Sequence, residues 1–432
     1  MVSWSLKCGL NAPPARVGVI GELASDTFEF FNMPYYNTQM KPTPRLLEKQ
    51  VKKAARAFGA VVLTGPRRSG KTWLLRHLYP RAQYFLFEDP DVVGRFRADP
   101  QGFLDGVKPP AILDEIQNVP EVFNYVRSRI DAAPGKKGQW LLTGSQESGL
   151  MQNVSESMAG RAAILQLLPL SLAESPKVDL LTGGYPEVLS RPRDASLWFA
   201  SYVQTYLERD VRAISAVQDL PTFRRFMALA ATRHGTVINM SDLAAPLGVS
   251  VPTIGRWFDI LEATGLMVRA LPFYENLGKR LIKSAKIYWT DSGLICHLLG
   301  IRTTAELERS PFLGAIFEGA VAAEIVKAQI NQGRRRELYY FRDHQGLEVD
   351  FIVPAEGGAY MLVEAKATRS PHPEMAKPML SLARAWGDAA GKRELARCVL
   401  VHRAARAAVR SSALVPGVVA WTFEELVVAL NA

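Results

Sequence analysis

The most informative segment of the chain is Gly65-Pro66-Arg67-Arg68-Ser69-Gly70-Lys71-Thr72. An apolar run at 60–64 precedes it, and residues with helical character follow from 71 to about 79. Glycine, four residues and then Gly-Lys-Thr between a strand and a helix is the pattern of a loop whose backbone N–H groups cradle phosphates. We expect Lys71 to reach the β- and γ-phosphates and Thr72 to ligate magnesium. The whole segment therefore predicts a binding site for ATP with Mg²⁺.

Two acids extend this prediction. They end the segment Ala111-Ile112-Leu113-Asp114-Glu115, in which an apolar strand runs into the carboxylates. In open parallel sheets ligands bind at the carboxyl ends of the strands, which places both acids beside the phosphate loop. We expect Asp114 to hold magnesium through water and Glu115 to polarise the attacking water. A solvated acidic pair at a strand end is the alternative.

A hydroxyl group and an arginine are further candidates for contact with the γ-phosphate. A third strand ends in Leu-Thr-Gly-Ser at 142–145, so the hydroxyl of Ser145 or Thr143 could contact the γ-phosphate or the lytic water. Arg161 precedes the next strand, and an arginine delivered to the γ-phosphate would stabilise transition-state charge. It could act on its own subunit or on a neighbour, and a surface ion pair is the alternative.

The order of elements predicts an α/β fold. Strands at 60–64, 84–88, 111–113, 139–143 and 163–167 alternate with helices, which indicates a parallel sheet covered on both faces. We expect this domain to span 41–175. Residues 1–40 show no sustained period and are expected to be a disordered leader or a misassigned start. Residues 176–220 are expected to form a helical lid or linker.

We expect residues 221–295 to form a winged-helix domain, with a helix–turn–helix layout at 236–264 and an exposed wing after it. Ser241 is expected to cap a first short helix, and a second helix runs to about 264 with Pro252 in its first turn. Thr253 and Arg256 should lie on the exposed side. A cationic cluster that could contact phosphates follows at Lys279, Arg280, Lys283 and Lys286. The alternative is a protein–protein module with a solvated lysine run.

Residues 296–432 carry a second acidic constellation. Asp350 interrupts an apolar strand, and Glu364 and Lys366 alternate along the next strand and so share a face. This spacing is the layout of restriction-endonuclease-like sites, in which Asp350 and Glu364 would bind magnesium and Lys366 would activate water. A helix carrying Glu318 and Glu324 could add a carboxylate. The alternative is an ion-pair network in a fold that does not cut.

The motifs together resemble a widespread prokaryotic family of AAA-type ATPases. The resemblance rests on the phosphate loop, Leu-Asp-Glu-Ile-Gln at 113–117, Leu-Thr-Gly-Ser at 142–145, Met-Ala-Gly-Arg at 158–161, Leu-Pro-Leu-Ser at 168–171 and Tyr-Leu-Glu-Arg-Asp-Val at 206–211. It covers residues 42–370 with the motif order intact. It implies a P-loop AAA-like domain, then a winged helix, then a restriction-endonuclease-like domain of unknown function. The family supplies no biological role.

The composition of the chain predicts its partners and its location in the cell. The net charge of +10 favours a polyanionic partner, with DNA as the candidate. The three cysteines show no metal-ligand spacing, and no apolar run is long enough for a membrane span, so we expect a cytoplasmic protein without a membrane partner. A homo-oligomer is compatible with the pattern.

These observations predict an ATPase that couples nucleotide state to DNA or to a partner. One alternative is a nucleotide-dependent switch or scaffold with a silent nuclease fold. A second alternative is an ATP-regulated DNA nuclease.

Overall fold

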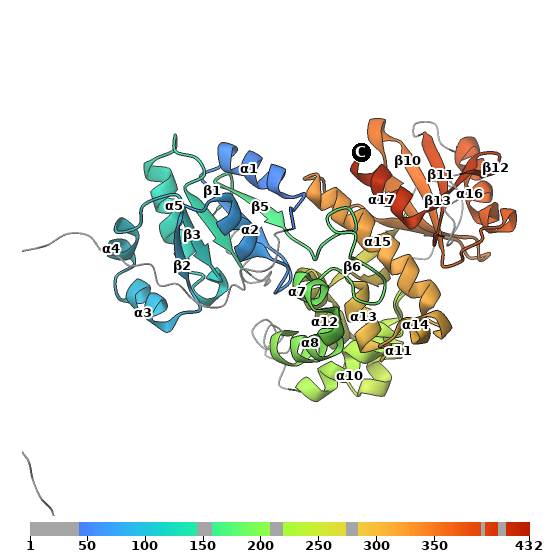
Figure 1. The fold of residues 1–432 in the computed structure, drawn as a ribbon, viewed down its shortest axis with the longest axis horizontal. Helices are drawn as coiled ribbons and strands as arrows, with labels where there is room; N and C mark the ends of the chain where they lie inside the picture. Colours follow the sequence, from blue (N-terminus) through green and yellow to red (C-terminus); the bar gives the residue numbers. More distant parts are fainter. Residues whose placement is uncertain (1–42, 145–157, 208–218, 274–283, 390–393, 405–411) are drawn as a thin grey trace, which may run out of the picture. The chain divides into compact units, whose positions relative to one another are not determined.

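A computed structural model describes residues 43–144, 158–207, 219–273, 284–389, 394–404 and 412–432. The leader predicted at 1–40 and Ser145 lie outside these residues, as do Lys279, Arg280 and Lys283. Figure 1 shows the elements in sequence colours. Of the helices in the described ranges, none is long and apolar enough to cross a membrane.

The first part of the chain is a five-stranded parallel sheet. The strand order is β2-β3-β4-β1-β5. The strands are β1 (Ala60–Thr64), β2 (Gln83–Leu86), β3 (Ala111–Asp114), β4 (Trp140–Thr143) and β5 (Ala162–Gln166). Every β1 residue is buried, as expected for an inner strand of a sheet covered by helices.

Helices cover both faces of this sheet. They are α1 (Glu48–Ala57), α2 (Lys71–Leu78), α3 (Pro90–Ala98), α4 (Pro100–Asp105) and α5 (Val122–Ala132), with a 3₁₀ turn η1 (Ile116–Asn118). Alternate strand residues point to opposite faces. Val61 and Leu63 therefore pack in one core with α1 and α2, while Ala60 and Val62 pack in another with α3, α4 and α5. The sheet so formed presents its strand ends to the loop before α2.

The middle of the chain is mostly helical. Its elements are α7 (Pro186–Ser190), α8 (Ala195–Tyr202), a π-helical turn (Val203–Leu207), α10 (Leu220–Ala231), α11 (Met240–Leu247), α12 (Val251–Ala263), α13 (Ser292–Leu298) and α14 (Thr304–Arg309). Aromatic side chains such as Phe226 and Trp257 fill its core. Gly248 takes the left-handed conformation that ends α11, with φ 67°.

The cap of α11 differs from the prediction. Asn239 is the N-cap, because its side chain accepts a hydrogen bond from the backbone N–H of Ser241. Both residue types are good caps, so sequence alone places this boundary only to within a few residues. Ser250 caps α12.

An eight-stranded sheet joins the middle to the C-terminal part. Its order is β12-β13-β11-β10-β9-β8-β6-β7. Strands β6 (Met267–Pro272) and β7 (Lys286–Trp289) form an antiparallel pair, and β6 adds to β8 (Tyr339–Arg342) in parallel. The boundary predicted near residue 295 thus falls between strands of one continuous sheet.

The C-terminal part completes this sheet. It contains α15 (Leu313–Asn331), β9 (Glu348–Pro354), β10 (Tyr360–Lys366), α16 (Lys377–Ala389), β11 (Leu395–His402), β12 (Ser412–Val415), β13 (Val418–Thr422) and α17 (Phe423–Asn431). Helix α15 is buried along most of its length, from Ile316 to Ile330, and its residues share a core with α1, β9 and β10.

Candidate nucleotide-binding site

The predicted phosphate loop lies between β1 and α2. Gly65 has φ 133°, and a Cβ there would lie 2.2 Å from the carbonyl oxygen of Leu167, so only glycine fits. Gly70 is also left-handed and directly precedes the first turn of α2, and the N–H groups and dipole of a helix N-terminus favour an anion. The loop therefore has the backbone geometry that a phosphate group requires.

Lys71 is folded onto this loop. Its ammonium group donates hydrogen bonds to the carbonyl oxygens of Gly65 (3.0 Å) and Pro66 (2.9 Å), and the residue is only 5% exposed. The lysine thus lies against the loop.

Asp114 gathers hydroxyl groups at the carboxyl ends of the strands. Thr72 donates to its two carboxylate oxygens at 3.0 and 2.9 Å, Tyr84 donates at 2.7 Å, and Thr143 donates as well. Burial, followed by the charge of Glu115, raises the pKa of Asp114, and the three hydroxyl donors act against that rise. A carboxylate and a threonine hydroxyl are hard oxygen ligands, so this pair fits Mg²⁺. Tyr84 was not predicted as part of the site.

Glu115 is held in a sparsely populated backbone conformation. Its φ is 58°, in the left-handed region that non-glycine residues rarely adopt, and such strain is typical of functional sites. Its backbone N–H donates to the hydroxyl of Thr143 at 3.3 Å. Its carboxylate accepts from Gln117 and lies 3.6 Å from the guanidinium of Arg67. The acid is therefore oriented by the phosphate loop itself.

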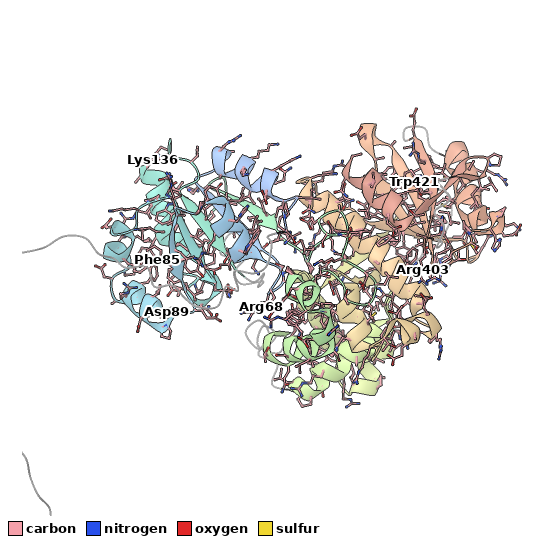
Figure 2. The ribbon with its side chains drawn as sticks, in the orientation of Figure 1. Arg68, Phe85, Asp89, Lys136, Arg403 and Trp421 are labelled. Atoms are coloured by element: carbon pink, nitrogen blue, oxygen red, sulfur yellow. The ribbon has the colours of Figure 1, made fainter. Side chains whose placement is uncertain are left out.

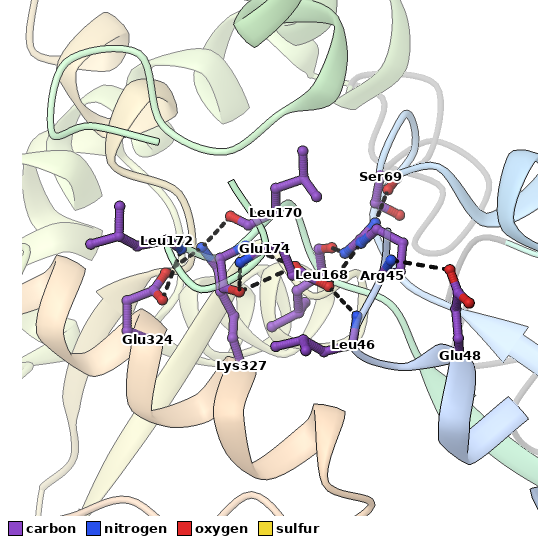
Figure 3. A network of polar contacts seen from close by, with 11 residues as sticks. Arg45, Leu46, Glu48, Ser69, Leu168, Leu170, Leu172, Glu174, Glu324 and Lys327 are labelled. Carbon is purple, nitrogen blue, oxygen red and sulfur yellow. Dashed lines mark hydrogen bonds and ion pairs between the residues drawn. The ribbon is translucent and has the colours of Figure 1, made fainter. Parts of the chain in front are cut away.

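A buried arginine, Arg45, forms a hydrogen bond to the phosphate loop. Arg45 donates to the carbonyl oxygens of Ser69 (2.8 Å) and Leu168 (2.7 Å), and its Nε donates to Glu174 at 3.0 Å. The side chains of Arg45 and Glu174 are 4% and 1% exposed. Figure 3 shows this arginine between the loop and the segment that follows β5. Sequence reasoning missed Arg45, because no motif marks it.

The same network continues to α15. Glu324 accepts from the backbone N–H of Leu172 at 3.1 Å, and Lys327 donates to the carbonyl oxygen of Leu170 at 3.0 Å and to Glu324 at 3.1 Å (Figure 3). Segment 168–174 is thus bonded to Arg45 on one side and to α15 on the other. Glu324 belongs to this network and is paired with Lys327 rather than with the acids of the C-terminal sheet.

Arg161 lies at the amino end of β5. Its carbonyl oxygen accepts from Ala60 at the start of β1, whereas the phosphate loop follows the end of β1, roughly 13 Å further along the strand. Its guanidinium is paired with Asp131 at 2.6 and 3.1 Å. The structure therefore does not bring Arg161 to the phosphate loop of its own chain. Ser145, the other candidate for the γ-phosphate, lies outside the described residues.

The C-terminal acids come together as the spacing predicted. Asp350 accepts from the backbone N–H of Ala365 at 2.9 Å, and Glu364 accepts from the backbone N–H of Asp350 at 3.4 Å and pairs with Lys366 at 2.7 Å. Burial, followed by the charge of Asp350, raises the pKa of Glu364 to about 8 and that of Glu318 to about 7. We call Glu318, Asp350 and Glu364 the acidic cluster.

Lys286 enters this cluster, contrary to the prediction that it lies in an exposed wing. The residue is 2% exposed, and its ammonium lies 3.2 Å from Glu318, 2.5 Å from Glu348 and 3.7 Å from Asp350. Burial alone would lower the pKa of Lys286, but these carboxylates outweigh burial and hold the pKa above its ordinary value. Among the described residues, no three His, Cys, Asp or Glu side chains form a group that could hold a metal ion.

The parallel sheet, the glycine loop and the acids at the strand ends define the first part of the chain as a P-loop ATPase-like domain. Residues 57–175 match the model of an AAA domain. Residues 177–305 match a domain of unknown function, DUF8612, and residues 313–417 match another, DUF4143.

Two relatives that match most of the chain show its family. The uncharacterized protein Rv2008c of Mycobacterium tuberculosis is 33% identical over 361 residues, which cover 82% of this chain and 78% of that protein. The uncharacterized protein Mb2031c of Mycobacterium bovis matches equally. The chain therefore belongs to the family of these mycobacterial proteins.

Solved structures with similar folds are more distant. The Walker-type ATPase PABY2304 of Pyrococcus abyssi is 15% identical, covers 58% of this chain and 94% of its own, and has a TM-score of 0.39. The RuvB Holliday junction branch migration motor of Thermotoga maritima is 18% identical, covers 52% and 88%, and has a TM-score of 0.29. Because both TM-scores are below 0.5, family membership rests on the domain models and the mycobacterial relatives.

Proposed function

We propose that this protein binds ATP with Mg²⁺ at the phosphate loop and hydrolyses it. The observation that carries the proposal is the convergence of Lys71, Thr72 and Asp114 at one edge of the sheet. Lys71 and the loop amides would hold the phosphates, and Thr72 and Asp114 would hold the metal, which neutralises charge on the γ-phosphate. Glu115, one residue further, would orient and polarise the attacking water.

A Glu115→Gln variant tests this assignment. The amide keeps the shape of the side chain but cannot act as a base, so Mg-ATP should still bind while turnover falls by about 10²–10⁴-fold. The measurement is phosphate release together with nucleotide binding by a fluorescent ATP analogue. Turnover equal to that of the wild type would remove Glu115 from its role.

We further propose that nucleotide state is transmitted to the C-terminal part through Arg45. A shift of the phosphate loop on binding would move the carbonyl oxygen of Ser69, to which Arg45 donates. Arg45 also contacts Leu168 and Glu174 in the segment that α15 holds through Lys327. Buried, fully bonded groups have few alternative arrangements, so a change at one end favours a change at the other.

Hydrogen exchange of the α15 amides tests this coupling. Mg-ATP should change exchange in residues 313–331 of the wild type. An Arg45→Met variant should lose that change even at ATP concentrations that saturate its site. Lys108→Met, at an exposed position, is the matched control and should behave as the wild type. An identical response in the Arg45 variant would rule out this route.

We propose that this coupling controls how a winged-helix part and a nuclease-like part of the chain engage DNA or a partner. The contacts of Lys286 favour the alternative in which the nuclease fold is silent and the protein is a switch. A buried ammonium among Glu318, Glu348 and Asp350 supplies the positive charge that a catalytic metal would otherwise supply.

Plasmid cleavage distinguishes this switch from an ATP-regulated nuclease. The assay compares the wild type with Asp350→Ala and Glu364→Ala in Mg²⁺ or Mn²⁺, with and without ATP. A switch gives no cleavage above background in all three proteins. Cleavage by the wild type that both variants lack would establish the nuclease.

A further inference from the structure

Helix α1 carries a row of exposed cations. Lys49, Lys52, Lys53 and Arg56 recur at intervals of three and four residues, so they share one side of the helix, and all four are exposed. The opposite side, with Val51, Ala54 and Ala55, is buried in the core. Figure 2 shows side chains of α1 reaching away from the sheet.

Two neighbouring segments lengthen this row. At its carboxyl end, the backbone N–H of Gly138 donates to the carbonyl oxygen of Phe58 at 2.8 Å, so the segment that carries the exposed Lys136 and Lys137 reaches the end of α1. At its amino end, Gly333 lies against Gln50, since a Cβ on Gly333 would be 2.9 Å from the Gln50 side-chain oxygen.

An arginine run follows Gly333 directly. The basic strip therefore comprises nine exposed residues: Lys49, Lys52, Lys53, Arg56, Lys136, Lys137, Arg334, Arg335 and Arg336. The acids within its segments are Glu48, which lies 3.9 Å from Lys52, and Glu337. The strip thus combines cations from three parts of the chain that contact one another.

A solvated helix face usually alternates charges of opposite sign. Here Lys49 and Lys53, and also Lys52 and Arg56, are like charges at i and i+4, which destabilise a helix by mutual repulsion. A polyanion relieves that repulsion. We propose that the basic strip binds the phosphate backbone of duplex nucleic acid, independently of the ATPase reaction.

Two other polyanionic surfaces fit less well. A helix that lies on a membrane inserts an apolar face, but the apolar face of α1 is buried in the protein core. Single-stranded nucleic acid is held by stacking on aromatic side chains, and none of the large apolar side chains exposed among the described residues lies on the strip. Duplex DNA carries about one charge per 1.7 Å of its axis, so a row of cations along α1, about 15 Å long, faces several phosphates.

The test is a binding titration of the full chain with a short fluorescent DNA duplex over a series of salt concentrations. The variant is Lys49→Glu with Lys53→Glu. The matched control is Arg193→Glu with Arg233→Glu, which changes the net charge equally at two exposed positions outside the strip, one before α8 and one after α10. Circular dichroism and Mg-ATP binding of each protein verify that the fold is retained.

The proposal predicts tight, salt-dependent binding by the wild type and the control. The strip variant should bind more weakly, and its dependence of log K on log salt should be shallower by roughly 2, about 0.9 for each phosphate that the variant no longer neutralises. Equal binding by the strip variant and the control would overturn the proposal. So would preference for a single strand, or binding to phosphatidylserine vesicles without binding to the duplex.

Discussion

The phosphate-loop site and the acidic cluster both bury carboxylates, yet they surround them differently. Asp114 is 3% exposed and accepts from neutral hydroxyl groups of Thr72, Thr143 and Tyr84. Asp350 is 6% exposed and lies within 3.7 Å of the ammonium of Lys286. A carboxylate with hydroxyl partners keeps its charge for an incoming cation. One that already faces an ammonium has its counter-ion, so burial of acids alone does not identify a metal site.

Of the substitutions that test this contrast, we expect the largest effect on stability at Lys286. Lys286→Met should leave Glu318, Glu348 and Asp350 without their shared cation and lower the free energy of unfolding by about 3–5 kcal/mol. Mn²⁺ should restore part of that stability by occupying the vacated position. Chemical denaturation measures both, with Lys366→Met as the control, since the Lys366 side chain is 38% exposed and should matter less. A Lys286 variant as stable as the wild type would break the comparison.

Asp114 should show the opposite behaviour. Asp114→Asn retains an oxygen for the hydroxyl donors but removes the charge that holds magnesium, so ATP turnover should fall by about 10²–10³-fold with little change in stability. Asp350→Asn should reduce stability and leave ATP turnover unchanged. Steady-state phosphate release measures the ATP turnover of each variant, and thermal unfolding measures its stability. The contrast fails if both substitutions affect the same property.

The pH dependence of stability tests the raised pKa of Glu364 in the acidic cluster. The folded protein holds the proton of Glu364 up to about pH 8, whereas the unfolded chain releases it near 4.5. Below both values the group is protonated in both states, and as pH rises between them only the unfolded chain loses the proton, so stability falls. Glu364→Gln should therefore flatten the fall in unfolding free energy over this interval. An unchanged pH profile would contradict the raised pKa.

The smallest effect is expected at Arg161. Its ion pair with Asp131 is solvent-exposed, and its strand end is remote from the loop, so Arg161→Ala should leave turnover by isolated chains unchanged. A decrease confined to protein concentrations at which chains associate would assign Arg161 to a neighbouring subunit. Turnover measured across a dilution series distinguishes the cases, and a decrease in isolated chains would contradict its placement.

Local patterns predicted the ATPase-like part well. The loop from Gly65 to Thr72 and the acids after Leu113 lie within short segments whose spacing and apolar neighbours indicate both structure and chemistry. The five strands of this sheet were likewise visible as apolar runs of the length expected for buried strands. Here the sequence signal is local, so the prediction needed no knowledge of tertiary contacts.

Long-range partners were beyond such patterns. Arg45 forms an ion pair with Glu174, and Lys286 forms ion pairs with Glu318 and Asp350. The partners in these pairs come from segments that are distant in the sequence. One signal was available: Lys286 begins an apolar strand, where a cation needs a partner. The elements after residue 404, β12, β13 and α17, were not predicted, although the capping box of Thr422 and Glu425 at the start of α17 is a local signal.

The most direct test of the nucleotide site is a calorimetric titration with Mg-ATP. We predict saturable heat at one site per chain for the wild type, none for Lys71→Ala, and a wild-type curve for Lys366→Ala. The first two results follow from the position of Lys71 against the loop, and the third from the distinct role of the acidic cluster. No heat with folded wild-type protein, or an unchanged curve for Lys71→Ala, would contradict the nucleotide-site assignment.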